Sequence, residues 1–152
     1  MMSLLLESMI PLAAQWATDQ EALILTQGVP LTTEQLADAQ RVGVLHPEKV
    51  RILKVAIIPG PTHPLLASAA KSVNLTGPNT LGLTLGYGIY IRADQGDSRP
   101  LVVHELAHTA QFERLGGINA FLRQYLKECL KDGYNNAPLE LEARNRALEI
   151  AG

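Results

Sequence analysis

The chain has 152 residues, of which 47% are hydrophobic and 18% charged, and its formal net charge is −2. This length supports one domain with one sizeable core, and the composition is typical of a globular protein. The sequence has no cluster of lysine and arginine and no aromatic RNA-binding pattern, so we expect no nucleic-acid partner. The single cysteine, Cys129, excludes an internal disulfide and a cysteine-rich zinc site, and its apolar neighbours predict a buried, inert thiol.

The N-terminal segment favours a first helix of a cytoplasmic protein over a secretory signal. Three leucines at positions 4–6 are followed at once by Glu7, and no basic segment precedes them. Residues 13–15 (AAQ) could mimic a cleavage site, so secretion remains an alternative. No apolar run approaches the ~20 residues of a membrane-spanning helix, so we expect no membrane contact.

The first part of the sequence predicts two helical regions. Residues 4–26 favour one or two helices, broken near Pro11 and closed at Gly28. Residues 32–35 (TTEQ) are typical of a helix N-terminus in which a threonine cap precedes a glutamate and a glutamine. This helix is expected to end at Gly43.

The middle of the sequence predicts strands. Residues 50–58 are rich in β-branched side chains and stop before a Pro-Gly-Pro sequence, which indicates a strand. Residues 64–73 favour a short alanine-rich helix with proline in its first turn. Residues 76–87 are rich in glycine and threonine, and residues 88–92 alternate as in a strand leading towards the next helix.

The last third predicts three helices. After a turn-like segment at 93–99, Pro100 should open a helix that closes at residues 116–117, both glycine. Residues 118–130 predict an amphipathic helix, and residues 138–151 predict a final one that opens with proline. The inner face of the second helix is expected to carry Ile118, Phe121, Leu122, Tyr125 and Cys129.

These elements predict a compact single domain of the α+β class, mostly helical with a small β-sheet. The domain spans residues 1–152, with N-terminal helices in 1–45, strands in 50–92 and the remaining helices in 100–152. The sheet should lie next to the helix that contains residues 104–108.

Residues 104–108 (HELAH) are the most informative feature of the chain. His104 and His108 are four residues apart, so on a helix both imidazoles lie on one face and can reach one ion. Glu105 could then reach a water molecule held by that ion. A solvated surface helix is the alternative interpretation, but the residues around the motif are mainly apolar, which indicates a buried helix whose polar groups need partners.

A catalytic zinc ion takes three protein ligands and leaves its fourth position to water. For the third ligand the sequence offers His46 and His63, each beside a proline in a predicted loop. It also offers Glu140 and Glu142 near the start of the last helix, where acidic residues are favoured by the helix dipole in any case.

The motif, followed some thirty residues later by a glutamate-rich helix, resembles the gluzincin metallopeptidases, and most closely a small bacterial group of minigluzincin-like peptidases. The shared features are the strand at 88–92, Gln111, and the stretch at 134–143 (YNNAPLELEA). The likeness covers roughly residues 80–150. It implies a zincin-like minimal fold, one Zn²⁺ ion, and a glutamate from the helix after the motif as the third ligand.

The resemblance favours Glu140 as that ligand. In gluzincins the glutamate is followed by a small residue at the third position after it and by an acid at the fourth. Glu140 is followed by Ala143 in this register, whereas Glu142 fits it less well. Arg144 stands where the family has an aspartate that supports a zinc-binding histidine, so another group must give that support.

The function implied by this resemblance is zinc-dependent hydrolysis of peptide bonds, with Glu105 as the general base on a zinc-bound water. Tyr134 is the candidate for stabilising the oxyanion, although a packing role is the alternative. Residues 86–91 could form an edge strand that pairs with a peptide substrate, or a plain core strand. Two other hypotheses are a zinc-binding regulatory or interaction module without catalysis of its own, and a metal-free helical interaction protein.

Overall fold

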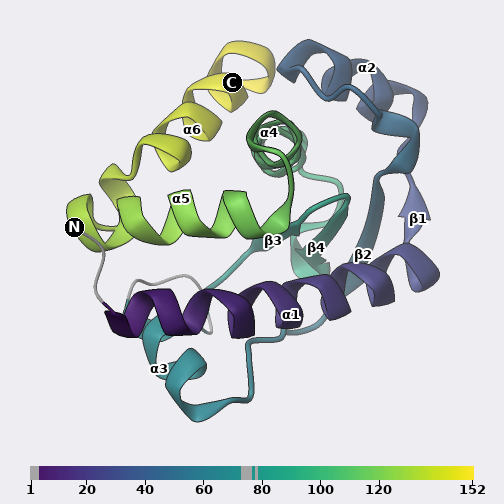
Figure 1. The fold of residues 1–152 in the computed structure, drawn as a ribbon. Coiled ribbons are helices and arrows are strands. Elements are labelled where there is room, and N and C mark those ends of the chain that lie inside the picture. The colour runs from purple at the N-terminus through teal and green to yellow at the C-terminus, as the bar shows by residue number, and fades with distance from the viewer. Residues whose placement is uncertain (1–3, 73–76, 78) are drawn as a thin grey trace.

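The computed structural model describes residues 4–72, 77 and 79–152 (Figure 1). These residues form six α-helices and a four-stranded sheet, which confirms the predicted α+β domain, mostly helical with a small sheet. The helices are α1 (Leu4–Gln27), α2 (Thr33–Val42), α3 (Pro64–Ser72), α4 (Arg99–Leu115), α5 (Ile118–Asp132) and α6 (Pro138–Ala151). The strands are β1 (Val29–Pro30), β2 (Arg51–Val55), β3 (Gly82–Leu85) and β4 (Gly88–Arg92).

The sheet has the order β1-β2-β4-β3. β2 and β4 are parallel, whereas β3 and β4 form an antiparallel hairpin. β2 is shorter than the predicted strand at 50–58, because β4 offers a pairing partner only along Arg51–Val55. At the hairpin turn Gly86 has φ +68°, a backbone conformation that residues with a Cβ rarely adopt, so the turn favours glycine.

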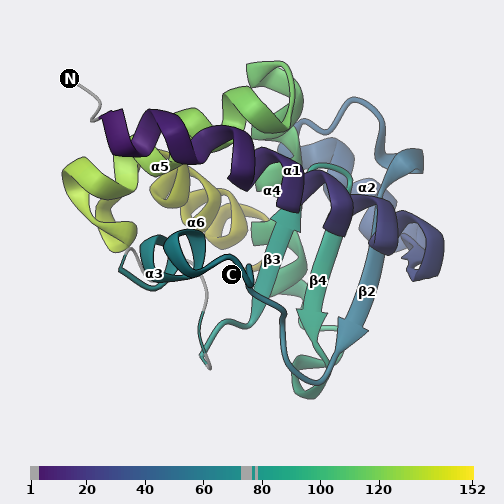
Figure 2. The same cartoon turned by 60° about the horizontal axis from the view of Figure 1, so that its bottom comes forward.

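The sheet lies between two helices that cover its two faces. α1 runs across one face and α4 lies against the other (Figures 1 and 2). Alternation along β4 explains this arrangement, because Tyr90 faces the core under α1 while Ile89 and Ile91 face the core under α4. This order places α4, with the motif, directly beside the edge of the sheet.

The predicted break of the first helix at Pro11 is wrong. α1 is one helix, with Pro11 inside it. The helix continues because Leu6, Met9 and Ile10 around the proline are buried against α3 and α5, and this packing offsets the hydrogen bond that proline cannot donate. Tertiary contacts therefore override the local signal.

The other predicted helix boundaries agree closely with the structure. α2 has the expected capping box, in which Thr32 accepts from the Gln35 amide and the Gln35 side chain accepts from the Thr32 amide, and it ends at Gly43. α4 is capped by Ser98, and α6 begins at Pro138. The predicted helix at 64–73 is α3; its last predicted residue, Val73, lies outside the described residues.

Cys129 is a free, buried cysteine on the inner face of α5. Burial, followed by the charge of Glu140, raises the pKa of its thiol to about 12, so the sulfur stays protonated and unreactive at neutral pH. In the part of the chain that the structure describes, no helix combines the length and the apolar character needed to cross a membrane.

Candidate metal centre

The two motif histidines lie on one face of α4, one turn apart. Their rings are 5.0 Å apart between centroids, and both are largely removed from solvent. This face is turned towards the start of α6, and α4 and α6 pack along each other. The predicted arrangement of His104 and His108 is therefore present.

Glu140 completes a cluster of three side chains. It lies in the first turn of α6 and is only 1% exposed. One carboxylate oxygen lies 2.7 Å from Nε2 of His104, and the other lies 3.2 Å from Nε2 of His108. Both imidazoles thus present their Nε2 atoms to the same buried carboxylate.

The residues of this cluster fit a zinc ion. One ligand atom from each side chain can be chosen so that all three lie within 4.8 Å of one another. A tetrahedral zinc ion would hold such atoms roughly 3.3 Å apart, since its bonds to nitrogen and oxygen are about 2.0–2.2 Å. Two imidazoles and one carboxylate are also the donors of a catalytic zinc site, which keeps one position open.

Charge and burial shift the pKa values of Glu140 and His108 in this cluster. Burial alone would raise the pKa of Glu140, but hydrogen bonds from His104 and His108 outweigh it and hold that pKa well below its usual range. Burial alone would lower the pKa of His108, yet the Glu140 carboxylate raises it to about 8. The metal-free cluster therefore binds a proton that a metal ion would displace.

We expect the metal-free protein to lose stability as the pH rises from about 6.5 to about 8. The pKa of His108 is about 8 in the folded state, against a reference value of 6.5, so the proton favours folding below pH 6.5 and this contribution disappears above pH 8. The loss should be about 2 kcal/mol. Urea unfolding in chelator at pH 6 and pH 8.5 measures it, and His108→Asn should remove the difference; a gain in stability on raising the pH would contradict the assignment.

Gln111 orients His108. Its side-chain oxygen lies 2.8 Å from Nδ1 of His108, and its amide nitrogen donates to the Leu139 carbonyl at 2.9 Å and to Glu142 at 2.7 Å. Because Nδ1 donates to the Gln111 oxygen, Nε2 is the ring nitrogen of His108 that faces Glu140. Gln111 thus supports one motif histidine, whereas Arg144 donates to Asn135 and not to the cluster.

The alternative ligands lie elsewhere. Glu142 accepts from Gln111 and from Arg114 at 3.0 Å, and its side chain is 45% exposed. His46 and His63 are both exposed, and neither belongs to the cluster. The geometry therefore favours Glu140 among the four candidates.

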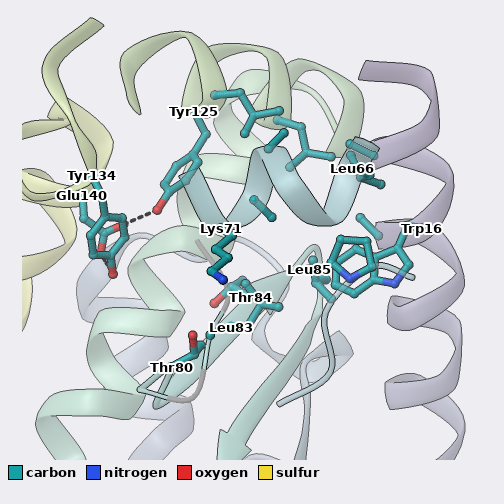
Figure 3. A pocket seen from close by; sticks show the side chains of 18 of the residues that line it. Trp16, Leu66, Lys71, Thr80, Leu83, Thr84, Leu85, Tyr125, Tyr134 and Glu140 are labelled. Carbon is teal, nitrogen blue, oxygen red and sulfur yellow. Dashed lines mark hydrogen bonds between the residues drawn. The ribbon is translucent and has the colours of Figure 1, made fainter. Parts of the chain in front are cut away.

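Two tyrosines contact Glu140, and the sequence interpretation identified only one of them. Tyr125 of α5 is buried and donates to Glu140 at 2.8 Å (Figure 3). Tyr134 donates to the other carboxylate oxygen at 3.3 Å, and its ring lies beneath the Arg144 guanidinium. Tyr125 was predicted on the inner face of its helix, but only the packing of α5 against α6 reveals that its hydroxyl meets the cluster.

Glu105 lies on the side of α4 that faces β3. Glu105 is only 5% exposed, and its carboxylate accepts a 2.7 Å hydrogen bond from the Thr84 hydroxyl, which also lies 3.0 Å from the Glu105 carbonyl oxygen. Gly82 closes the other side, because a Cβ at that position would lie 2.9 Å from the carboxylate. β3 therefore fixes the position of Glu105.

Of the two interpretations of residues 86–91, an edge strand or a core strand, the structure confirms the core strand. β4, at Gly88–Arg92, lies between β2 and β3, so it is a central strand and cannot accept a further strand. The edge beside α4 is β3, which came from the glycine- and threonine-rich segment that had no assigned element. The edge strand of the sheet is therefore the one next to Glu105.

A cavity of about 1210 Å³ opens over this cluster (Figure 3). His104, Glu105, His108, Tyr134 and Glu140 form its polar end. Its remaining walls come mainly from apolar side chains of α1, α3, α5 and β3. A ligand in this cavity can therefore contact the cluster, which is not enclosed in the core.

The chain matches no protein-family model, and neither the curated proteins nor the solved structures give a significant match.

Proposed function

We propose that this protein is a zinc-dependent metallopeptidase. The observation that carries the proposal is the meeting of Glu140 from α6 with both histidines of α4, while Glu105 faces the adjoining cavity. A buried set of three metal-binding side chains beside a carboxylate and a large cavity is the arrangement that metal-assisted hydrolysis requires. The HELAH sequence at 104–108 supports the same class.

A bound zinc ion would polarise the substrate carbonyl and make water a better nucleophile at neutral pH. Glu105 accepts the proton of the attacking water and passes it to the leaving amine. Thr84 holds the carboxylate of Glu105 in place during both transfers. Tyr134, which lines the cavity, is proposed to donate a hydrogen bond to the oxyanion; burial and the nearby Glu140 raise its pKa, so it remains protonated.

The outer edge of β3, which pairs with no other strand in the described part of the chain, supports a peptide as the substrate. Leu81 accepts a backbone hydrogen bond from Arg92, so along the hairpin residues 81, 83 and 85 face β4. By alternation the backbone groups of Gly82 and Thr84 point away from β4, towards the open edge. An extended peptide added there would run beside Glu105.

We expect Thr84→Val to lower kcat about tenfold or more with little change in KM. Valine keeps the shape of threonine but removes the donor to Glu105, so the base loses its fixed position while substrate contacts remain. Thr84→Ser is the matched control because it keeps the hydroxyl. Steady-state kinetics on a cleaved peptide measures both constants, and equal activity of the two variants would contradict the positioning role.

The proposal is tested on untagged protein, because a histidine tag would bind metal itself. We expect about one zinc ion per chain by elemental analysis and cleavage of casein or of a peptide library. Chelation with 1,10-phenanthroline should abolish cleavage, and added zinc should restore it. Zinc binding without cleavage would instead favour the non-catalytic zinc-binding module, and the absence of zinc would remove both hypotheses.

We also propose that residues 4–27 remain in the mature, cytoplasmic protein. Leu6, Met9 and Ile10 are buried against the rest of the fold. Cleavage near residues 13–15 would remove these three buried side chains. It would also remove part of the cavity wall, because Leu6 and Met9 line the cavity. Mass spectrometry of the protein from its native host tests this.

A further inference from the structure

The cavity extends well beyond the metal cluster and is large for a ligand pocket. At about 1210 Å³ the whole cavity exceeds the ~300–1,000 Å³ of common ligand pockets. The wall away from the metal cluster includes Trp16 of α1, Leu66 of α3, Leu83 and Leu85 of β3, and Leu122 of α5. Such a wall favours an extended apolar group over a polar one.

The mouth of the cavity is apolar as well. Leu5, Leu65 and Leu130 line it, and they are 60%, 56% and 58% exposed. They come from α1, α3 and α5, so three separate helices present leucine to solvent around one opening. Exposed apolar side chains gathered around a cavity are typical of a binding site for an apolar ligand.

One positive charge lies among the side chains that line this cavity, and it is exposed to solvent. Lys71, in the last turn of α3, is the sole lysine or arginine among the described residues that line the cavity. Its side chain extends from α3 into the cavity, with Tyr134 and Glu140 on one side of it and Trp16 on the other (Figure 3). Its ammonium group forms no ion pair with any residue in the described ranges, so it can bind an anion.

We propose that the cavity binds an amphipathic carboxylate, with the apolar chain among the leucines and the carboxylate at Lys71. The apolar wall selects the chain, and the single cation selects its charged end. Two sources have this chemistry, namely a free fatty acid and the C-terminus of an apolar peptide. The site lies beyond the metal cluster and its occupation requires no metal, so the proposal does not depend on peptidase activity.

Trp16 makes the test direct, because it is the only tryptophan of the chain and it lines the cavity. Dodecanoate and dodecanol, below the micelle concentration of dodecanoate, are titrated into metal-free protein while Trp16 emission is followed. We expect dodecanoate to bind roughly tenfold more tightly than dodecanol, since only the acid can pair with Lys71. The tripeptide acetyl-Leu-Leu-Leu, as free acid and as amide, forms the second arm, and the tighter of the two acids identifies the source.

Lys71→Met should abolish the preference for the acid and leave the alcohol unchanged. Lys131→Met is the matched control, because Lys131 is exposed on α5 and does not line the cavity. Leu65→Asp, at a half-exposed position, should weaken both dodecanoate and dodecanol, and circular dichroism verifies that each variant is folded.

The proposal is overturned if neither acid binds, if each acid binds no better than its neutral counterpart, or if Lys71→Met keeps the preference. Sedimentation of the unliganded protein tests one other occupant. If the chain forms a dimer that Leu65→Asp dissociates, a second copy covers the leucine mouth and the carboxylate site is wrong.

Discussion

Glu105→Gln is expected to reduce the proposed peptide cleavage by roughly 10²–10⁴-fold, which is the range that a general base contributes. Glutamine has the shape of glutamate and can still accept from Thr84, but it cannot take a proton from water. Glu105 is not a member of the metal cluster, so zinc content should stay at the level of the unchanged protein. Initial rates on one peptide and elemental analysis of the same preparations give both values.

The paired measurement separates catalysis from folding and from metal binding. A variant that keeps zinc and loses cleavage assigns Glu105 to proton transfer. Cleavage that persists at the original rate would show that another group removes the proton, or that a contaminating peptidase is responsible. Loss of zinc would place Glu105 in the metal site, which the distances within the cluster do not suggest.

Glu140→Gln is expected to weaken zinc binding by more than the ~10–100-fold that loss of an outer-shell partner costs. The carboxylate is the only anionic group of the cluster, and both histidines approach it. An amide keeps the volume and can still accept from Tyr125, so the fold should survive the change. Competition with a fluorescent zinc chelator measures the affinity.

Glu142→Gln is the control for this experiment. It lies two residues further along the same helix and removes the same charge, but its side chain contacts Gln111 and Arg114 instead of the histidines. Zinc affinity should therefore change only a few-fold. The opposite result, with Glu142 essential and Glu140 dispensable, would overturn the assignment of the third ligand.

The elements that the sequence predicted best are those whose signals are local. The capping box at Thr32 and Gln35, the glycine after α4 and the proline that opens α6 all act within one turn of helix. The two histidines are likewise related by helix geometry alone. Their spacing predicts that they share one face of the helix, but it does not predict which helix packs against that face.

What could not be predicted depends on contacts between elements distant in sequence. Tyr125 faces Glu140 because α5 packs beside α6, and Thr84 reaches Glu105 because the hairpin lies against α4. β3 itself has weak strand propensity, and it exists through its pairing with β4. Pro11 shows the converse, since buried neighbours keep a helix intact where the local rule predicts a break.

The position of Glu140 in the final helix has a consequence for biosynthesis. Ribosomes make a chain from its N-terminus, so His104 and His108 emerge before the carboxylate that completes their cluster. A nascent chain that ends before α6 has the two imidazoles without the carboxylate, and we expect it to bind zinc weakly. If the proposed zinc site is correct, the ligand set becomes complete only when α6 has docked on α4, so an unfinished chain would lack the proposed peptidase activity.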